Sequence, residues 1–152
     1  VNALPFFNRD NCNGDNFHYT SAEQMKTAID FWLLEYSKKY YVRWAIVDKA
    51  TNAAIGTIEL FNRKAKDYFT DCGLLRLDLR SDYEQRDEIE SILRLIMSFA
   101  FGDFQCHKVA TKAVSQAVER IAALESLGFQ ATDEYLIGHD GTKYDSYFVI
   151  AK

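Results

Sequence analysis

At 152 residues, the chain is long enough to form one domain with its own hydrophobic core. Hydrophobic residues make up 48% of it and charged residues 26%, which is ordinary for a globular protein. The net charge of −4 argues against a sequence-independent nucleic-acid-binding protein, which needs a basic face, and the apolar stretches are too short to cross a bilayer. We therefore predict a single domain over residues 1–152 that binds neither nucleic acid nor membrane.

Three cysteines, Cys12, Cys72 and Cys106, lie far apart and form no C-x-x-C pair. A sparse, odd set of cysteines is typical of reduced thiols, so we interpret each as a buried structural thiol in a cytoplasmic protein. The three histidines are equally scattered, and no group of residues has the spacing of metal ligands. We predict no metal site.

Residues 1–19 contain the only proline, Pro5, and a polar run from Asn8 to Asn16. The run faintly resembles a calcium-binding loop, but its glycine would place Arg9 at the first ligand position, where a hard cation needs an oxygen. We interpret this segment as a plain loop.

The next segment predicts an amphipathic helix. Thr20 and Glu23 have the spacing of a capping box, in which each side chain satisfies a backbone N–H group at the start of the helix. Apolar residues then recur on one face, at Met25, Ala28, Ile29, Trp32, Leu33 and Tyr36. We expect this face to pack against the core.

Three strand patterns follow the helix. Residues 41–48 and 55–61 are rich in apolar and β-branched residues, and the short turn segment between them predicts an antiparallel hairpin. In residues 75–80, three leucines alternate with charged residues, which indicates a strand with one buried and one polar face.

The second half of the chain alternates helices and strands. The patterns predict a helix over residues 87–100, a strand over 107–114, a helix over 116–127 that ends at Gly128, a strand over 129–136, a turn over 139–142 and a strand over 144–150. This order predicts an α/β fold with a central mixed sheet flanked by helices.

Four short sequence segments and their order along the chain are informative: Trp44 to Lys49, Ala54 to Leu60, Leu75 to Arg80, and Leu124 to Phe129. Together they resemble the GNAT superfamily of acetyltransferases, in particular its ribosomal-protein N-terminal acetyltransferases, over roughly residues 40–151. The resemblance implies acetyl-CoA as co-substrate and an amine as acceptor. GNAT domains usually begin with a further strand and helix, which are absent here or replaced by residues 1–19.

In the family, a loop of the form Q/R-x-x-G-x-G/A cradles the pyrophosphate of CoA with backbone N–H groups at a helix N-terminus. The equivalent segment here, residues 84–89, has Asp87 and Ile89 at the glycine positions and Glu84 where Gln or Arg is usual. The resemblance implies cofactor contacts from Gln85, Arg86, Asp87, Glu88 and Ile89, and from the backbone of Leu77 and Leu79. Each carboxylate about 6 Å from a phosphate costs roughly 2–3 kcal/mol before salt screening, and Arg86 offsets part of that cost.

A second departure lies in the next helix. The family's Asn-x-x-Ser falls on Ala117 and Arg120, and the tyrosine that acts as general acid in many members falls on Leu124. The groups that bind the pantetheine arm and protonate the leaving thiolate are therefore missing from their usual positions.

Acetyl transfer to an amine also needs a group that accepts the amine proton. Glu59 is the carboxylate that we would test first as base, directly or through a water, with Asp78 as a second candidate. The alternative for Glu59 is a solvated strand charge or an ion pair with Arg43 or Arg63.

Arg76 and Arg80 could contact a phosphate or an acidic substrate, and their alternative is a structural ion pair with Asp78, Asp82 or Glu84.

Two functions follow from these observations. One is an N-acetyltransferase acting on a protein N-terminus or a small-molecule amine, and the other is a GNAT-fold protein that has lost acyl transfer and binds another ligand or a protein partner. Because open sheet edges favour strand pairing between chains, a homodimer is also plausible.

Overall fold

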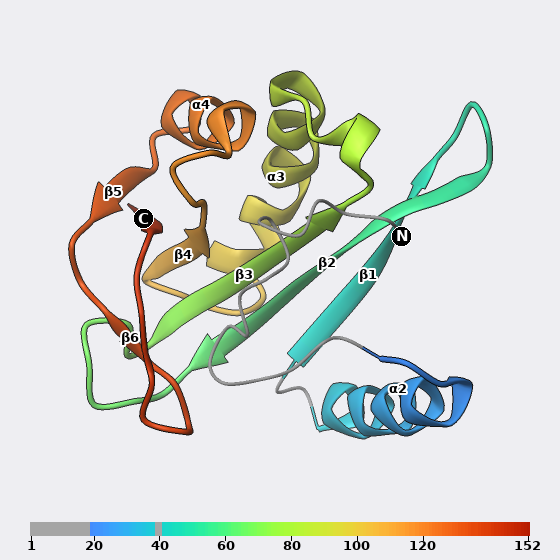
Figure 1. Cartoon of the computed structure of the whole chain (residues 1–152). Helices are drawn as coiled ribbons and strands as arrows, with labels where there is room; N and C mark the ends of the chain where they lie inside the picture. Colours follow the sequence, from blue (N-terminus) through green and yellow to red (C-terminus); the bar gives the residue numbers. More distant parts are fainter. Residues whose placement is uncertain (1–18, 39–40) are drawn as a thin grey trace.

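The computed structural model describes residues 19–38 and 41–152, which build a six-stranded sheet with helices on both faces (Figure 1). The elements are α2 (Ala22–Ser37), β1 (Tyr41–Asp48), β2 (Ala53–Arg63), β3 (Cys72–Leu79), the 3-10 helix η2 (Ser81–Tyr83), α3 (Arg86–Phe101), β4 (Lys108–Lys112), α4 (Val118–Ser126), β5 (Gln130–Thr132), β6 (Leu136–Ile137), β7 (Lys143–Tyr144) and β8 (Tyr147–Ala151). The strand order is β1-β2-β3-β4-β8-β5, and only the β3–β4 pair is parallel. The predicted mixed α/β sheet is confirmed.

The main core lies between the sheet and the two helices α3 and α4, which cover the same face (Figure 1). Leu77 and Leu79 of β3 pack there with Ile89 and Leu93 of α3, and each of these four side chains is at most 3% exposed. The alternation predicted for β3 is thus confirmed on this face. Gly128 follows α4 with a φ of 89°, the left-handed conformation predicted for the end of that helix.

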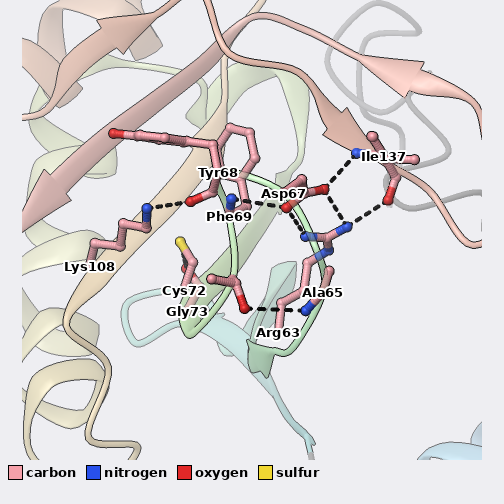
Figure 2. Close-up of polar contacts among 10 residues, drawn as sticks. Arg63, Ala65, Asp67, Tyr68, Phe69, Cys72, Gly73, Lys108 and Ile137 are labelled. Carbon is pink, nitrogen blue, oxygen red and sulfur yellow. Dashed lines mark hydrogen bonds and ion pairs between the residues drawn. The ribbon is translucent and has the colours of Figure 1, made fainter.

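A second core lies on the opposite face of the sheet, where Phe69 and Tyr147 are buried. The loop that supplies Phe69 is held by Asp67 (Figure 2). The Asp67 carboxylate accepts hydrogen bonds from the Arg63 guanidinium, from the Phe69 amide over 2.9 Å and from the Ile137 amide over 3.0 Å. This cluster ties the β2–β3 loop to β6, so its charged groups have structural partners.

Two features of α2 differ from the prediction. The N-cap is Ser21, whose hydroxyl accepts from the Gln24 amide, while the Gln24 side chain accepts from the Thr20 amide; the predicted Thr20–Glu23 box is therefore wrong by one residue. No residue of α2 is buried. The helix lies against the edge strand β1, where Trp32 stacks on Arg43 at 3.8 Å, so the apolar face expected in the core stays outside it.

The C-terminal strands are shorter than predicted. The expected strand over residues 129–136 divides into β5 in the main sheet and β6 in a two-stranded sheet with β7. The expected strand over residues 144–150 divides at Ser146, whose φ of 63° is incompatible with an extended strand. The turn between β6 and β7 is confirmed, because the Gly138 amide donates to the Thr142 carbonyl over 2.8 Å.

Among the described residues, no helix has both the length and the apolarity that a membrane span requires. No three His, Cys, Asp or Glu side chains of residues 19–38 and 41–152 gather as a metal site would require. Cys72 and Cys106 are buried free thiols, as predicted, and Cys12 lies outside the described residues.

Candidate functional site

β3 is longer than its parallel neighbour β4. The two strands pair only from Cys72 to Leu75 on β3, with residues 108–111 on β4. Beyond that point β3 continues to Leu79, and on its other side it stays paired with β2 through Leu79, which lies opposite Gly56. The last four residues of β3 therefore have one edge that β4 does not pair with.

The backbone groups of Leu77 and Leu79 point toward this unpaired edge. The Arg80 amide donates to the Ile55 carbonyl of β2 over 2.7 Å, so the backbone of Arg80 faces β2. Because successive residues of a strand direct their backbone groups to opposite sides, those of Leu77 and Leu79 face away from β2. They are the two residues that the family resemblance assigned to the pantetheine arm. We call this edge, together with the first turn of α3, the β3–α3 site.

Arg120 of α4 contacts the unpaired edge directly. Its guanidinium donates to the Leu77 carbonyl oxygen over 2.9 Å and also pairs with both carboxylate oxygens of Glu84. The side chains of Arg120 and Glu84 are only 6% and 3% exposed, so this is a buried ion pair. Burial raises the pKa of the Glu84 carboxyl, and the positive charge of Arg120 opposes that rise.

The N-terminus of α3 is capped by a side chain of α4. The N-cap residue Gln85 makes no side-chain capping bond, and the backbone N–H of Arg86 donates to Glu119 Oε2 over 3.1 Å. The Ile89 amide donates to the Gln85 carbonyl in the first bond of the helix. The amides of Arg86, Asp87 and Glu88 thus belong to the turn whose N–H groups have no partner inside the helix.

The side chains of this turn differ in their surroundings. Gln85, Arg86, Asp87 and Glu88 are exposed, whereas Ile89 is fully buried in the main core. The Arg86 guanidinium pairs with Glu90 over 2.8 Å, so its charge is shared with a neighbour on the same helix.

Two positions at which the family has functional polar side chains are core positions here, one just before α4 and one within it. Leu124, where many members of the family have a tyrosine, is 0% exposed, and Ala117 is 1% exposed. Neither side chain carries a polar group, so neither can bind the arm or protonate a thiolate.

Glu59 lies on the face of the sheet opposite the side chains of Leu77 and Ile58. Its carboxylate is buried and accepts hydrogen bonds from the Tyr41 hydroxyl over 3.0 Å and from the Arg43 guanidinium. Desolvation and the bond to Glu59 raise the pKa of the Tyr41 hydroxyl well above its usual range. The ion pair with Arg43, given as the alternative to a catalytic role, is therefore present.

The other charged residues of β3 also have partners. Arg76 pairs with Asp78 over 2.9 Å, and Arg80 pairs with Asp82 over 2.6 Å. These are the ion pairs given above as alternatives to substrate binding.

Sequence reasoning missed the roles of Glu119 and Arg120. The available signal was a double departure from the family pattern with opposite charges: Glu84 replaces Gln or Arg, and Arg120 replaces Ser. Two such changes of opposite charge are an indication that the side chains meet, and the structure shows that they do.

The family profile described as "Acetyltransferase (GNAT) domain" matches residues 8–130. The chain therefore belongs to the GNAT acetyltransferase family. No curated protein sequence matches it.

Solved structures share its fold at low sequence identity. One described as a probable acetyltransferase is 20% identical with a TM-score of 0.68, over 89% of this chain and 74% of that one. A ribosomal-protein alanine acetyltransferase from Vibrio fischeri is 16% identical with a TM-score of 0.67, over 97% and 82%. Spermidine N-acetyltransferase from Vibrio cholerae, solved with CoA and spermine, is 13% identical with a TM-score of 0.62, over 88% and 76%.

The donors and acceptors of the β3–α3 site fit a nucleotide thioester. The Leu77 carbonyl accepts an N–H bond, which an amide of a pantetheine arm would also supply, and the Arg86 amide binds an anion, as it would bind a phosphate. In this structure, Arg120 supplies the donor to the Leu77 carbonyl, and Glu119 supplies the anion at the Arg86 amide.

Proposed function

We propose that this chain is an N-acetyltransferase that transfers an acetyl group from acetyl-CoA directly to an amine. The observation that carries the proposal is the unpaired edge of β3 beside the first turn of α3, in a chain of the GNAT family. In the proposal, the backbone of Leu77 and Leu79 holds the pantetheine arm, and the amides of Gln85 to Glu88 hold the pyrophosphate. The Ile89 amide is not among the groups that hold the pyrophosphate, because it donates to the Gln85 carbonyl within α3.

Acetyl-CoA, when bound, supplies the thioester that the amine attacks. The chain must accept the proton of that amine, and Glu59 is the carboxylate to test first. Because the Arg43 guanidinium and the Tyr41 hydroxyl both donate to the Glu59 carboxylate, we propose that the amine proton reaches it through a water or through Tyr41. Glu59→Gln keeps the shape of the side chain and should lower kcat with little change in the affinity for CoA.

The acceptor in this proposal is a primary amine of a protein N-terminus or a small molecule. The named acceptors and ligands of the solved neighbours, a ribosomal protein and spermidine or spermine, share that group. We place the reaction in the cytoplasm, where thiols such as Cys72 and Cys106 stay reduced.

Calorimetric titration of the whole chain with acetyl-CoA and with CoA tests the proposal. Saturable binding below about 1 mM, followed by acetyl transfer and thiol release with spermidine or an N-terminal peptide, is the expected result. A chain that melts cooperatively and binds neither compound at millimolar concentration would rule out the proposed reaction.

A second function is favoured by the buried ion pair between Glu84 and Arg120. Under this alternative the chain is a non-catalytic member of the family that binds a different ligand or a protein partner. It is distinguished from the first by the same titration, because it requires no response to acetyl-CoA at any accessible concentration.

A homodimer remains part of the proposal. β1 lies at one end of the strand order formed by residues 41–152, and an edge strand can pair with a second copy. Light scattering after size-exclusion chromatography should give twice the mass of the chain; a single-chain mass at 100 µM would contradict this part.

A further inference from the structure

Two consecutive residues in the first turn of α4 contact the two halves of the β3–α3 site. Glu119 accepts from the Arg86 amide, where an anionic phosphate would bind, and Arg120 donates to the Leu77 carbonyl, where an amide of the cofactor arm would donate. The charges of the two side chains match these roles: an anion lies at the helix N-terminus and an N–H donor lies at the strand carbonyl. While α4 makes these contacts, Glu119 takes the single N–H of Arg86, and the Arg120 guanidinium takes one of the two acceptor positions of the Leu77 carbonyl oxygen.

We propose that Glu119 and Arg120 form an internal latch that keeps the β3–α3 site closed and that CoA must displace. This inference rests on the proposed function and adds a control step to it. The latch consists of the contacts Glu119–Arg86, Arg120–Leu77 and Arg120–Glu84. The apparent affinity for CoA is then the intrinsic affinity reduced by the small fraction of molecules in which the latch is open.

The two parts of the latch differ in strength. Glu119 is exposed, so its bond to the Arg86 amide competes with water and opens readily. Arg120 and Glu84 are buried together. Separating them costs more free energy, because each charge then lacks both its partner and full hydration by water. We therefore expect the phosphate half of the site to open first and the Arg120 contact to dominate the cost.

The competing interpretation is purely structural. α3 has no capping side chain of its own, so Glu119 could serve as its cap, and Arg120 could simply fasten α4 to β3. A structural role predicts that removing these contacts lowers stability and leaves the affinity for CoA unchanged or lower. A latch predicts that the affinity rises.

The test uses the whole chain and three variants. The double variant Glu84→Gln/Arg120→Ser removes both buried charges together and restores the residue types usual in the family. Glu119→Ala removes only the hydrogen bond between the Arg86 amide and the Glu119 carboxylate. Ser126→Ala is the matched control, because it removes another bond between α4 and α3, from the Ser126 hydroxyl to Glu90, at the opposite end of α4.

Each protein is titrated with CoA and separately with ADP, which has the pyrophosphate and lacks the pantetheine arm. The double variant should bind CoA about tenfold more tightly than the parent chain and ADP about equally. Glu119→Ala should bind both compounds more tightly, and Ser126→Ala should match the parent within about twofold.

The outcomes separate the two proposals. If the parent chain binds CoA and the double variant binds it equally or more weakly, the latch is overturned while the proposed function stands. If no protein binds CoA at millimolar concentration although all melt cooperatively, the proposed function fails and the latch fails with it. Should the double variant not fold, Glu119→Ala decides alone, since unchanged ADP and CoA affinities in that variant overturn the latch.

Discussion

The guanidinium of Arg120 and the carbonyl oxygen of Leu77, 43 residues apart in sequence, are joined by a 2.9 Å hydrogen bond between α4 and β3. This bond lies at the edge of β3 that β4 leaves unpaired. It also requires a buried counter-charge, which Glu84 provides. Under the proposed latch, the affinity of the site for CoA and the stability of the fold both depend on the Arg120 side chain.

Arg120→Ala should destabilise the fold strongly. It leaves the Glu84 carboxylate buried without its cation, and breaking a buried pair in this way typically costs about 3–5 kcal/mol of unfolding free energy. Urea denaturation measures the loss. The matched comparison is Glu84→Gln/Arg120→Ser, which removes both charges and should recover more than half of it; equal losses for the two variants would show that the charge pair is not the cause.

Asp67→Asn should destabilise the β2–β3 loop in a pH-dependent way. Although burial raises its pKa, hydrogen bonds from Arg63 and from the Ile137 and Phe69 amides hold the pKa of the Asp67 carboxyl below its ordinary value. The unfolded chain therefore binds this proton more readily than the folded chain. The stabilisation by Asp67 is complete above about pH 4 and is lost as the pH falls through the folded pKa.

Melting curves from pH 7 to pH 3 for the parent chain and Asp67→Asn check this expectation. The variant should be less stable by about 3 kcal/mol at pH 7, because it leaves the buried Arg63 guanidinium without its carboxylate. The difference should shrink below pH 4. A constant difference over the whole range would contradict the assignment.

The two positions at which the family has glycines should respond differently to glycine. Ile89→Gly empties a fully buried core position and should cost at least about 3 kcal/mol of stability. Asp87 is exposed in the first turn of α3, so Asp87→Gly should cost about 1 kcal/mol or less. Chemical denaturation distinguishes the two.

Asp87→Gly should also strengthen CoA binding, and Asp87→Ala separates the causes. Both remove a carboxylate near the expected phosphates, so both should lower the Kd by up to about tenfold at low salt. Any further gain of glycine over alanine reports the space taken by the Cβ atom. If both substitutions weaken binding, the pyrophosphate lies elsewhere.

Gly56→Ala should destabilise the sheet beside the β3–α3 site. A Cβ atom at Gly56 would lie 2.2 Å from the Asp78 carbonyl oxygen on β3, and both are backbone positions that cannot move independently. We expect a loss of about 1–3 kcal/mol by thermal unfolding. Gly141→Ala is a useful comparison, since a Cβ atom there meets nothing within 4 Å and the loss comes only from its φ of 81°.

The Cys72 thiol should be unreactive in the folded chain. Burial raises its pKa to about 12, so almost no thiolate is present at pH 8. Alkylation followed by peptide mass spectrometry should show modification of Cys72 only after denaturation. Rapid modification at pH 8 without denaturant would show that this core opens.

Local patterns predicted most elements correctly, because they depend on neighbouring residues alone. The leucine alternation in residues 75–80 and the helical spacing that begins at Ile89 both appear in the structure with the predicted faces buried. Residues 41–48 form β1 with the predicted bounds. The same reasoning failed for α2, because an apolar face shows that a helix can be buried but not whether a partner surface lies opposite it.

The sequence by itself determined the α/β element order, the GNAT family and the unusual acidic residues at the start of α3. Each of these features depends only on residue identity and on short spacings along the chain. Only the tertiary structure decided that Arg120 and Glu119 lie on the β3–α3 site and that Glu59 is paired with Arg43. The physical reason is the crossover from β3 through α3 and β4 to α4, which returns α4 to β3. Contacts made by such a return depend on how helices pack on the sheet, and no local spacing records them.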